Sequence, residues 1–248
     1  MEPIDFSPEP LPTPEGPRPV PWEDLEGIPA FWDRVGRTFQ LAFSSPMEFF
    51  ERIPQSEGLA RPWGFLLFTS LPNYLLLLAI FLFAGVVLAF MQGLADAKEI
   101  LFRQHPAMAW ILPLALGGLL LLMPLLQFLG MLLLGGLQHL FLWMFGGTRE
   151  GVPAQHTIRA CTYAWAIIGL IAFLPSLIPY LGVLIVLPIH IVGLVFTGMG
   201  LARLHRTDTW RGIAAVFAPM VLLCCCAMVL WFGLIASVII PNAMKAAH

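Results

Sequence analysis

Four long stretches of the sequence contain no aspartate, glutamate, lysine or arginine: residues 64–95, 104–148, 160–202 and 212–244. A run of about 18 or more apolar residues without charge is long enough to cross a bilayer as a helix. The 13 basic and 15 acidic residues all lie elsewhere, and charged residues make up 11% of the chain, against about 25% in a soluble domain. So few charges cannot cover a water-facing surface, and the sequence therefore predicts an integral membrane protein.

The charge-free stretches predict an all-α, polytopic transmembrane helical bundle of about five spans within residues 64–240. The predicted spans are residues 64–91, 107–145, 158–177, 181–202 and 212–240, followed by a short C-terminal tail at 241–248. The second span is unusually long, because its 39 residues would reach about 58 Å as a helix, roughly twice the hydrocarbon thickness. It is either one kinked helix or two tight spans.

The distribution of basic residues favours one span there. With five spans and a cytoplasmic N-terminus, ten basic residues lie on the cytoplasmic side and three on the other side, whereas six spans would divide them into six and seven. Cytoplasmic loops carry an excess of lysine and arginine. The sequence therefore predicts a multi-pass protein of the cell (inner) membrane with its N-terminus in the cytoplasm.

The N-terminal segment is acidic and rich in proline. Nine prolines fall within residues 1–30, and residues 1–27 hold seven acidic residues against Arg18 alone. Proline lacks a backbone donor, and a negative segment is repelled by anionic lipid. We therefore expect residues 1–27 to be a disordered cytoplasmic tail that is dispensable for folding and is a candidate binding segment for a cytoplasmic protein.

Residues 28–63 are predicted to form amphipathic interfacial helices. Apolar residues recur at helical spacing over residues 28–43, and Ser45-Pro46-Met47-Glu48 is typical of the start of a second helix over residues 46–53, with Ser45 as its N-cap. These helices are expected to lie on the membrane surface or to dock against the bundle. The candidate docking residues are Phe31, Trp32, Val35, Phe39, Pro46, Phe49 and Phe50.

Two sets of polar residues are further candidates for function. His139 and His190 are the candidate intramembrane polar residues, since ionisable groups within spans often mark ion pathways; hydrogen bonding to a helix backbone is the alternative explanation. A basic turn near the end of the fourth span is a candidate binding site for anionic lipid headgroups, with ordinary positive-inside topology as the alternative. Its candidate residues are Arg203, His205, Arg206 and Arg211.

The sequence contains no motif that is typical of an enzyme or of a cofactor-binding protein. The sequence contains no nucleophile motif, phosphate loop or metal-ligand spacing, so we expect no enzyme activity, no cofactor, no metal and no nucleic-acid partner. Small residues four apart, such as Gly198 and Ala202, allow close approach of helix backbones, either within one chain or in a homo-oligomer.

Three short motifs resemble the YIP domain family, the Ypt/Rab-interacting-protein-like membrane proteins, in its bacterial branch. They are Pro46-Met47-Glu48-Phe49-Phe50 followed by Gly58 and Pro62; Gly146-Gly147 ahead of Thr157-Ile158-Arg159-Ala160 and Tyr163-Ala164; and Gly200-Leu201-Ala202-Arg203-Leu204-His205 followed by Ala214. The resemblance covers roughly residues 40–240 and implies a five-span fold with a cytoplasmic N-terminus. The Asp-Leu-Tyr-Gly-Pro sequence of the eukaryotic branch is absent, so Rab binding does not carry over.

Together these features predict a non-enzymatic membrane protein that organises or binds membrane lipids or partner proteins. The alternative is a transporter of small molecules or lipids, for which broken helices around prolines would be the supporting feature. A polar cavity within the bundle would favour the transporter, and a closed apolar bundle with a lipid-facing groove would favour the organising protein.

Overall fold

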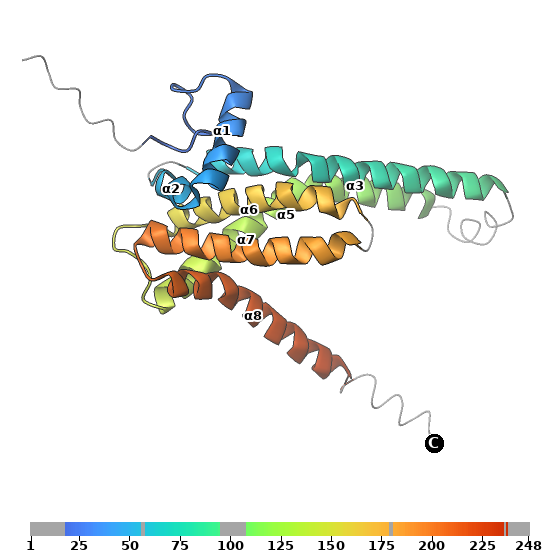
Figure 1. Cartoon of the computed structure of the whole chain (residues 1–248). Helices are drawn as coiled ribbons and strands as arrows, with labels where there is room; N and C mark the ends of the chain where they lie inside the picture. The colour runs from blue at the N-terminus through green and yellow to red at the C-terminus, as the bar shows by residue number, and fades with distance from the viewer. Residues whose placement is uncertain (1–17, 56–57, 95–107, 179–180, 236, 238–248) are drawn as a thin grey trace, which may run out of the picture.

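The computed structural model describes residues 18–55, 58–94, 108–178, 181–235 and 237, and these residues form helices and no strands. Two short helices precede the long ones: α1 (Phe31–Ser44) and α2 (Pro46–Glu51). The long helices are α3 (Ala60–Leu94), α5 (Met108–Met144), α6 (Ala154–Ser176), α7 (Leu181–His205) and α8 (Thr209–Leu234). Figure 1 shows α3, α5, α6 and α7 running side by side, while α8 leaves the bundle at an angle.

Five helices in the described part of the chain are long and apolar enough to cross a membrane, which confirms the predicted all-α, five-span bundle. The five segments are Ala60–Phe83, Leu121–Met144, Ala154–Ser176, Gly182–His205 and Thr209–Gly233. The long second stretch is one continuous helix of 37 residues rather than two spans. Residues 1–17 and 238–248, which include most of the predicted N-terminal tail and the whole C-terminal tail, lie outside the described residues.

Helix α6 is the central element of the bundle. It contacts α3, α5 and α7. In the most apolar 18-residue segment of α6, 61% of the residues are buried, against 17–22% in the other four candidate spans. The small residues Ala160 and Ala164 are fully buried on α6, and Gly135 of α5 leaves so little room that an added Cβ would lie 3.0 Å from Cα of Ile158. Short side chains thus let α6 pack closely against its neighbours.

Helices α7 and α8 cross closely through small residues. An added Cβ at Gly198 would lie 2.6 Å from Cα of Ile213, and one at Gly212 would meet the carbonyl oxygen of Gly198 and the Cβ of Ala202. The predicted small-residue pair of Gly198 and Ala202 is therefore used for packing within the chain. Helices can approach this closely only where a side chain is missing or is reduced to a methyl group.

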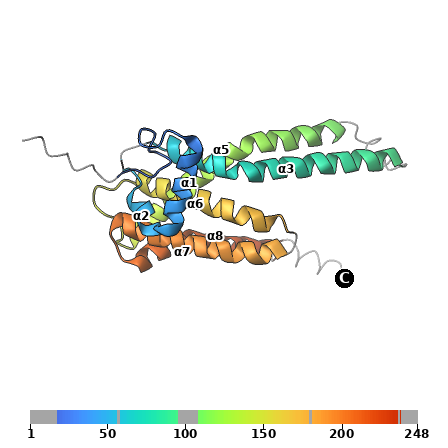
Figure 2. The same ribbon diagram turned by 45° about the horizontal axis from the view of Figure 1, so that its top comes forward.

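The outer surface of the bundle is apolar. Large hydrophobic side chains are strongly exposed on α3, α5, α7 and α8, among them Phe83, Leu121, Val183 and Val229. A water-soluble protein rarely exposes a continuous apolar surface of this kind, whereas lipid tails solvate it. Figures 1 and 2 also show that α3 and α5 extend together well beyond the far ends of α6 and α7.

One end of the bundle is covered, and we call it the capped end. Helices α1 and α2, the loop after α5 and the turn between α7 and α8 all gather there (Figures 1 and 2). Hydrogen bonds join these segments: Nη1 of Arg211 donates to the carbonyl of Gly146 at 2.6 Å, and Nε1 of Trp22 donates to the carbonyl of Arg61 at 2.8 Å.

Candidate functional site at the capped end

Helix α2 is held at the capped end by two buried aromatic rings. Phe49 and Phe50 are fully buried. The ring of Phe50 lies 5.0 Å from that of Phe196 and occupies the space that a side chain at position 200 would fill, where the chain has glycine. Burying a large aromatic side chain contributes roughly 1.5–3 kcal/mol. These two rings therefore fix α2 against α6 and α7.

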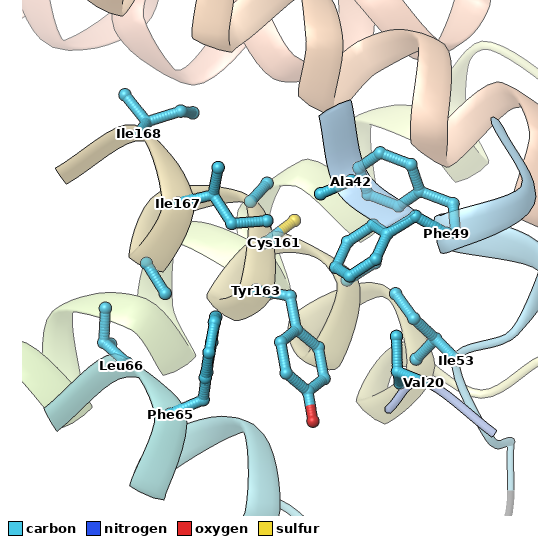
Figure 3. Close-up of a cluster of buried hydrophobic side chains, with 14 of the residues drawn as sticks. Val20, Ala42, Phe49, Ile53, Phe65, Leu66, Cys161, Tyr163, Ile167 and Ile168 are labelled. Atoms are coloured by element: carbon cyan, nitrogen blue, oxygen red, sulfur yellow. The ribbon is translucent and has the colours of Figure 1, made fainter. Parts of the chain in front are cut away.

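Tyr163 lies at the centre of this aromatic core. Its ring centroid is 5.9 Å from that of Phe49 and 5.5 Å from that of Phe65. Figure 3 shows the Tyr163 ring between Phe65 on one side and Val20 and Ile53 on the other. The core of the capped end thus combines side chains from α2, α3, α6 and the segment before α1.

Helix α2 starts at the predicted residue, but its N-terminus is not capped by a side chain. Ser45 is the N-cap residue, as predicted, but its side chain makes no capping hydrogen bond. Glu48 forms an ion pair with Arg52, four residues later. Opposite charges at this spacing attract each other along a helix, and the carboxylate of Glu48 therefore turns away from the N-terminus of α2. The backbone N–H of Ser45 donates to the carbonyl of Leu41 and so ends α1.

Glu23 and Arg159 form a fully buried ion pair beneath this core. Nη2 of Arg159 lies 2.6 Å from both carboxylate oxygens of Glu23. Nη1 of Arg159 donates to the carbonyl of Gly58, and the hydroxyl of Tyr163 donates to Oε1 of Glu23. The buried charges are stable there because each is paired and further hydrogen-bonded.

The ion pair corrects the predicted extent of the N-terminal tail. Residues 1–27 were expected to be disordered, yet Val20 and Glu23 are buried and Trp22 packs 5.2 Å from Phe65. The prediction of disorder used the average composition of residues 1–27, whereas the packing of this segment depends on a few individual side chains. Residues 18–27 are therefore part of the fold, and residues 1–17 lie outside the described residues.

A chain of hydrogen bonds links three helices beside the ion pair. The backbone N–H of Arg149 donates to Nδ1 of His205 at 3.4 Å. Nε2 of a neutral His205 then carries the proton and donates to Oγ1 of Thr157 at 2.9 Å, and the Thr157 hydroxyl donates to Nδ1 of His139 at 2.8 Å. His156 nearby donates from Nε2 to the carbonyl of Ile53 at 2.9 Å.

The predicted intramembrane histidines lie in different surroundings. His139 belongs to the chain of hydrogen bonds at the capped end, while Nδ1 of His190 donates to the carbonyl of Val186 at 2.8 Å and its ring lies 5.9 Å from that of Trp165. Backbone hydrogen bonding, the alternative considered from sequence, thus describes His190. A further polar contact within the spans joins Gln127 of α5 to Ser70 and Tyr74 of α3.

The residues of the predicted basic turn have four different environments. Arg203 is exposed and its Nε lies 3.1 Å from Oε1 of Glu51. His205 is buried within the hydrogen-bond chain and is not available to a ligand at the surface, which corrects its predicted role. Arg206 is exposed, and Arg211 binds the loop after α5 and stacks on Trp210 at 5.5 Å.

The predicted docking residues of α1 are buried to different degrees. Phe39 packs 5.6 Å from Phe65, Val35 is half-buried, and Phe31 lies 5.6 Å from Trp22. Trp32 remains 71% exposed. Exposed aromatic residues at the end of a membrane bundle suit the interface between lipid and water, so contact of α1 with the membrane surface stays a prediction.

Two of three cavities that border α2 also reach α7. The first, which we call the polar pocket, has a volume of about 620 Å³ and is lined by Glu51, Gln55, Arg149, His156, Ala202, Arg203, Leu204, Arg206 and Thr207. The second, which we call the apolar groove, has a volume of about 430 Å³ and is lined by Ala42, Phe43, Pro46, Ile167, Ile168, Ile171, Pro188, Ile189, Val192, Gly193 and Phe196. Both volumes fall in the range of small-molecule sites, about 300–1,000 Å³.

A family model described as Yip1 domain matches residues 41–242 of the chain. The chain belongs to the Yip1 domain family. This match confirms the resemblance drawn from the short motifs, and the motif residues Phe49, Phe50, Thr157, Arg159 and Arg203 all lie at the capped end. No curated protein and no solved structure matches the chain.

The Yip1 match also shows what sequence reasoning missed. Glu23 lies before the matched segment, so the buried acidic partner of Arg159 comes from outside the Yip1 domain. The sequence did offer one signal: Arg159 is a charged residue at the second position of the predicted span 158–177. A charge placed there needs a partner, but the sequence does not say which of the 15 acidic residues supplies it.

Proposed function

We propose that this Yip1-domain protein is a non-enzymatic membrane protein that binds a membrane lipid through the apolar groove. The Yip1 family is a family of non-enzymatic membrane proteins, and the five apolar helices place the chain in a membrane. The observation that carries the proposal is the groove between α6 and α7, whose lining side chains are apolar throughout. Such a groove suits an acyl chain rather than a polar solute.

The shape of the groove depends on close packing at its floor. An added Cβ at Gly193 would lie 2.5 Å from Cδ1 of Ile168, so a larger residue there would disturb the wall. Pro46 at the start of α2 and Phe196 of α7 also line the groove. A rigid, preformed wall lowers the entropic cost of ordering a flexible chain against it, which favours retention of one lipid over the surrounding bilayer.

The transporter alternative would require a polar cavity within the bundle. The polar pocket lies instead where α7 ends, beside α2 and the loop after α5. A second cavity with charged lining residues lies against the segment before α1, α1 and α2. Both positions favour an organising or binding role. We also propose that the capped end faces the cytoplasm of the inner membrane, because the arginine-rich turns gather there.

A protein partner is the second part of the proposal. Glu23 is paired with Arg159 at the capped end, and four further acidic residues precede Arg18 in the sequence. A short acidic, proline-rich segment tethered at that point suits a partner with a basic surface in the cytoplasm. A homo-oligomer remains a prediction.

The lipid proposal is tested by filling the groove. Val192 lines the groove and is 68% exposed, whereas Leu184, on the same helix, is 70% exposed and lies outside the groove lining. Native mass spectrometry of mildly solubilised protein should show a retained lipid on the wild type and on Leu184→Trp, and loss of it on Val192→Trp. Equal retention by both variants, or no retained lipid on the wild type, would overturn the proposal.

A further inference from the structure

The polar pocket carries an excess of positive charge. Three arginines, Arg149, Arg203 and Arg206, line it together with one carboxylate, that of Glu51. Glu51 is already paired with Arg203 at 3.1 Å. Among the described residues, neither Arg149 nor Arg206 has an acidic partner. The pocket therefore offers two guanidinium groups, from two different loops, to a ligand.

The backbone at Arg206 supports a role for its side chain. Arg206 has a φ of 52°, in the left-handed region that favours glycine. It ends α7 in a Schellman motif, with the N–H of Thr207 donating to the carbonyl of Ala202 at 2.9 Å. The same motif ends α5, where the N–H of Gly147 donates to the carbonyl of Leu142 at 2.8 Å and the left-handed residue is Gly146, with a φ of 64°.

The C-terminal ends of α5 and α7 thus differ in the residue at the left-handed position, which is Gly146 in α5 and Arg206 in α7. Glycine adopts the left-handed conformation without steric cost, whereas arginine adopts it at a cost in free energy. Arg206 makes no ion pair with the described residues that would offset this cost. An unfavourable residue at a position where glycine would fit better points to a use for the side chain beyond the fold.

We propose that the polar pocket binds a phosphate monoester, held between the guanidinium groups of Arg149 and Arg206. A guanidinium donates two parallel hydrogen bonds to a phosphate, and two such groups match the several oxygens of one phosphate monoester. Arg203, which is paired with Glu51, also lines the pocket. The pocket volume of about 620 Å³ leaves room for the group that carries the phosphate.

The phosphate has two possible carriers, a lipid headgroup or a soluble molecule. The pocket lies at the capped end, where the spans meet the aqueous phase, and both carriers reach that position. The proposal concerns the polar pocket alone and does not depend on an acyl chain in the apolar groove.

The test uses the full chain in nanodiscs and in lipid-free detergent. In detergent, inorganic phosphate and glycerol 3-phosphate are titrated by calorimetry. In nanodiscs, phosphatidic acid is compared with phosphatidylglycerol, whose phosphate is a diester. Saturable binding of the soluble monoester identifies a soluble carrier, and retention of phosphatidic acid over phosphatidylglycerol without binding of the soluble probes identifies a lipid. Binding of neither overturns the proposal.

The variant Arg206→Gly separates binding from folding. It removes the guanidinium and places at the left-handed position the residue that favours it, so the melting temperature without ligand should be unchanged or higher while affinity falls at least tenfold. Arg149→Gln should lower affinity to a similar degree. Arg61→Gln is the control, since Arg61 is exposed at the same end but lies outside the pocket. Unchanged affinity in Arg206→Gly, or an equal loss in Arg61→Gln, would overturn the proposal.

Discussion

The carboxylate of Glu23 lies 2.6 Å from the guanidinium of Arg159, 136 residues later in the chain, and both side chains are fully buried. The contact joins the segment before α1 to the central helix α6. It also lies against Tyr163, the residue around which the aromatic core of the capped end is arranged. The N-terminal segment is therefore a structural part of the bundle from about Arg18 onward.

The ion pair predicts a large effect of removing one partner alone. Glu23→Gln should destabilise the protein by about 3–5 kcal/mol, because it leaves a buried guanidinium uncompensated. The measurement is thermal unfolding in detergent. Glu26→Gln, at an exposed position in the same segment, should leave the melting temperature unchanged.

A double variant distinguishes charge pairing from packing. Glu23→Leu combined with Arg159→Met should be less destabilising than Arg159→Met alone, because apolar side chains of similar size replace a buried ion pair at little cost. A double variant that is less stable than either single change would show that the hydrogen bonds to Gly58 and Tyr163 matter more than the charges.

Truncation of the N-terminal segment should affect stability only when residues from Arg18 onward are removed. Removing residues 1–17 is expected to leave the melting temperature nearly unchanged, whereas removing residues 1–27 takes away Val20, Trp22 and Glu23 and should lower it clearly. Unfolding followed by intrinsic fluorescence measures both. Similar melting temperatures for the two truncated proteins would contradict the assignment of residues 18–27 to the fold.

The docking of α2 is tested by Phe49→Asp combined with Phe50→Asp. Both rings are fully buried, so two unpaired carboxylates would enter an apolar core and the fold should be lost or strongly weakened. Leu25→Asp, at a more exposed position, serves as the control for adding charge. Expression and monodispersity in detergent provide the measurement, and a double variant as stable as the control would show that α2 does not hold the capped end together.

The crossing of α7 and α8 depends on the missing side chain at Gly212. Gly212→Ala should destabilise the bundle by about 1–3 kcal/mol, because the new Cβ would meet the carbonyl of Gly198 and the Cβ of Ala202. Gly233→Ala on the same helix has open space around it and should have no such effect. Melting temperatures of the two variants in detergent decide between these outcomes.

The orientation of the capped end is tested with an impermeant thiol reagent. Single cysteines replace Lys98 and Asp208 in a protein that lacks the native Cys161, Cys224, Cys225 and Cys226. In intact cells, the reagent should label position 98 and not position 208, because the basic turn beside Asp208 is expected in the cytoplasm. The reverse pattern would place the capped end outside.

The membrane helices were predictable because length and charge decide them. A helix in lipid satisfies its own backbone hydrogen bonds, so an uncharged apolar run of sufficient length is enough to predict a span. The single helix α5 was harder to predict, since Pro113, Pro124 and paired glycines allowed a break that the structure does not contain. Charge distribution, rather than local propensity, favoured the correct choice.

The polar groups at the capped end were less predictable. His205 and Arg206 are neighbours in a basic turn and look alike in sequence, yet one is buried and hydrogen-bonded to Thr157 while the other is exposed in a left-handed conformation. Arg149 lines the polar pocket together with Arg206, although it lies in a loop more than 50 residues earlier in the sequence. Such differences arise from tertiary packing and cannot be predicted from the spacing of residues along the sequence.

The unequal lengths of the helices set a condition on the surrounding bilayer. At about 1.5 Å per residue, the 35 residues of α3 and the 37 of α5 reach about 53–56 Å, and the 23 residues of α6 reach about 35 Å. A hydrocarbon core of about 30 Å matches α6 and leaves the α3–α5 pair too long. Tilting of that pair or local thickening of the membrane must absorb the mismatch, so the protein should prefer thicker bilayers and deform thin ones on the side where α3 and α5 lie.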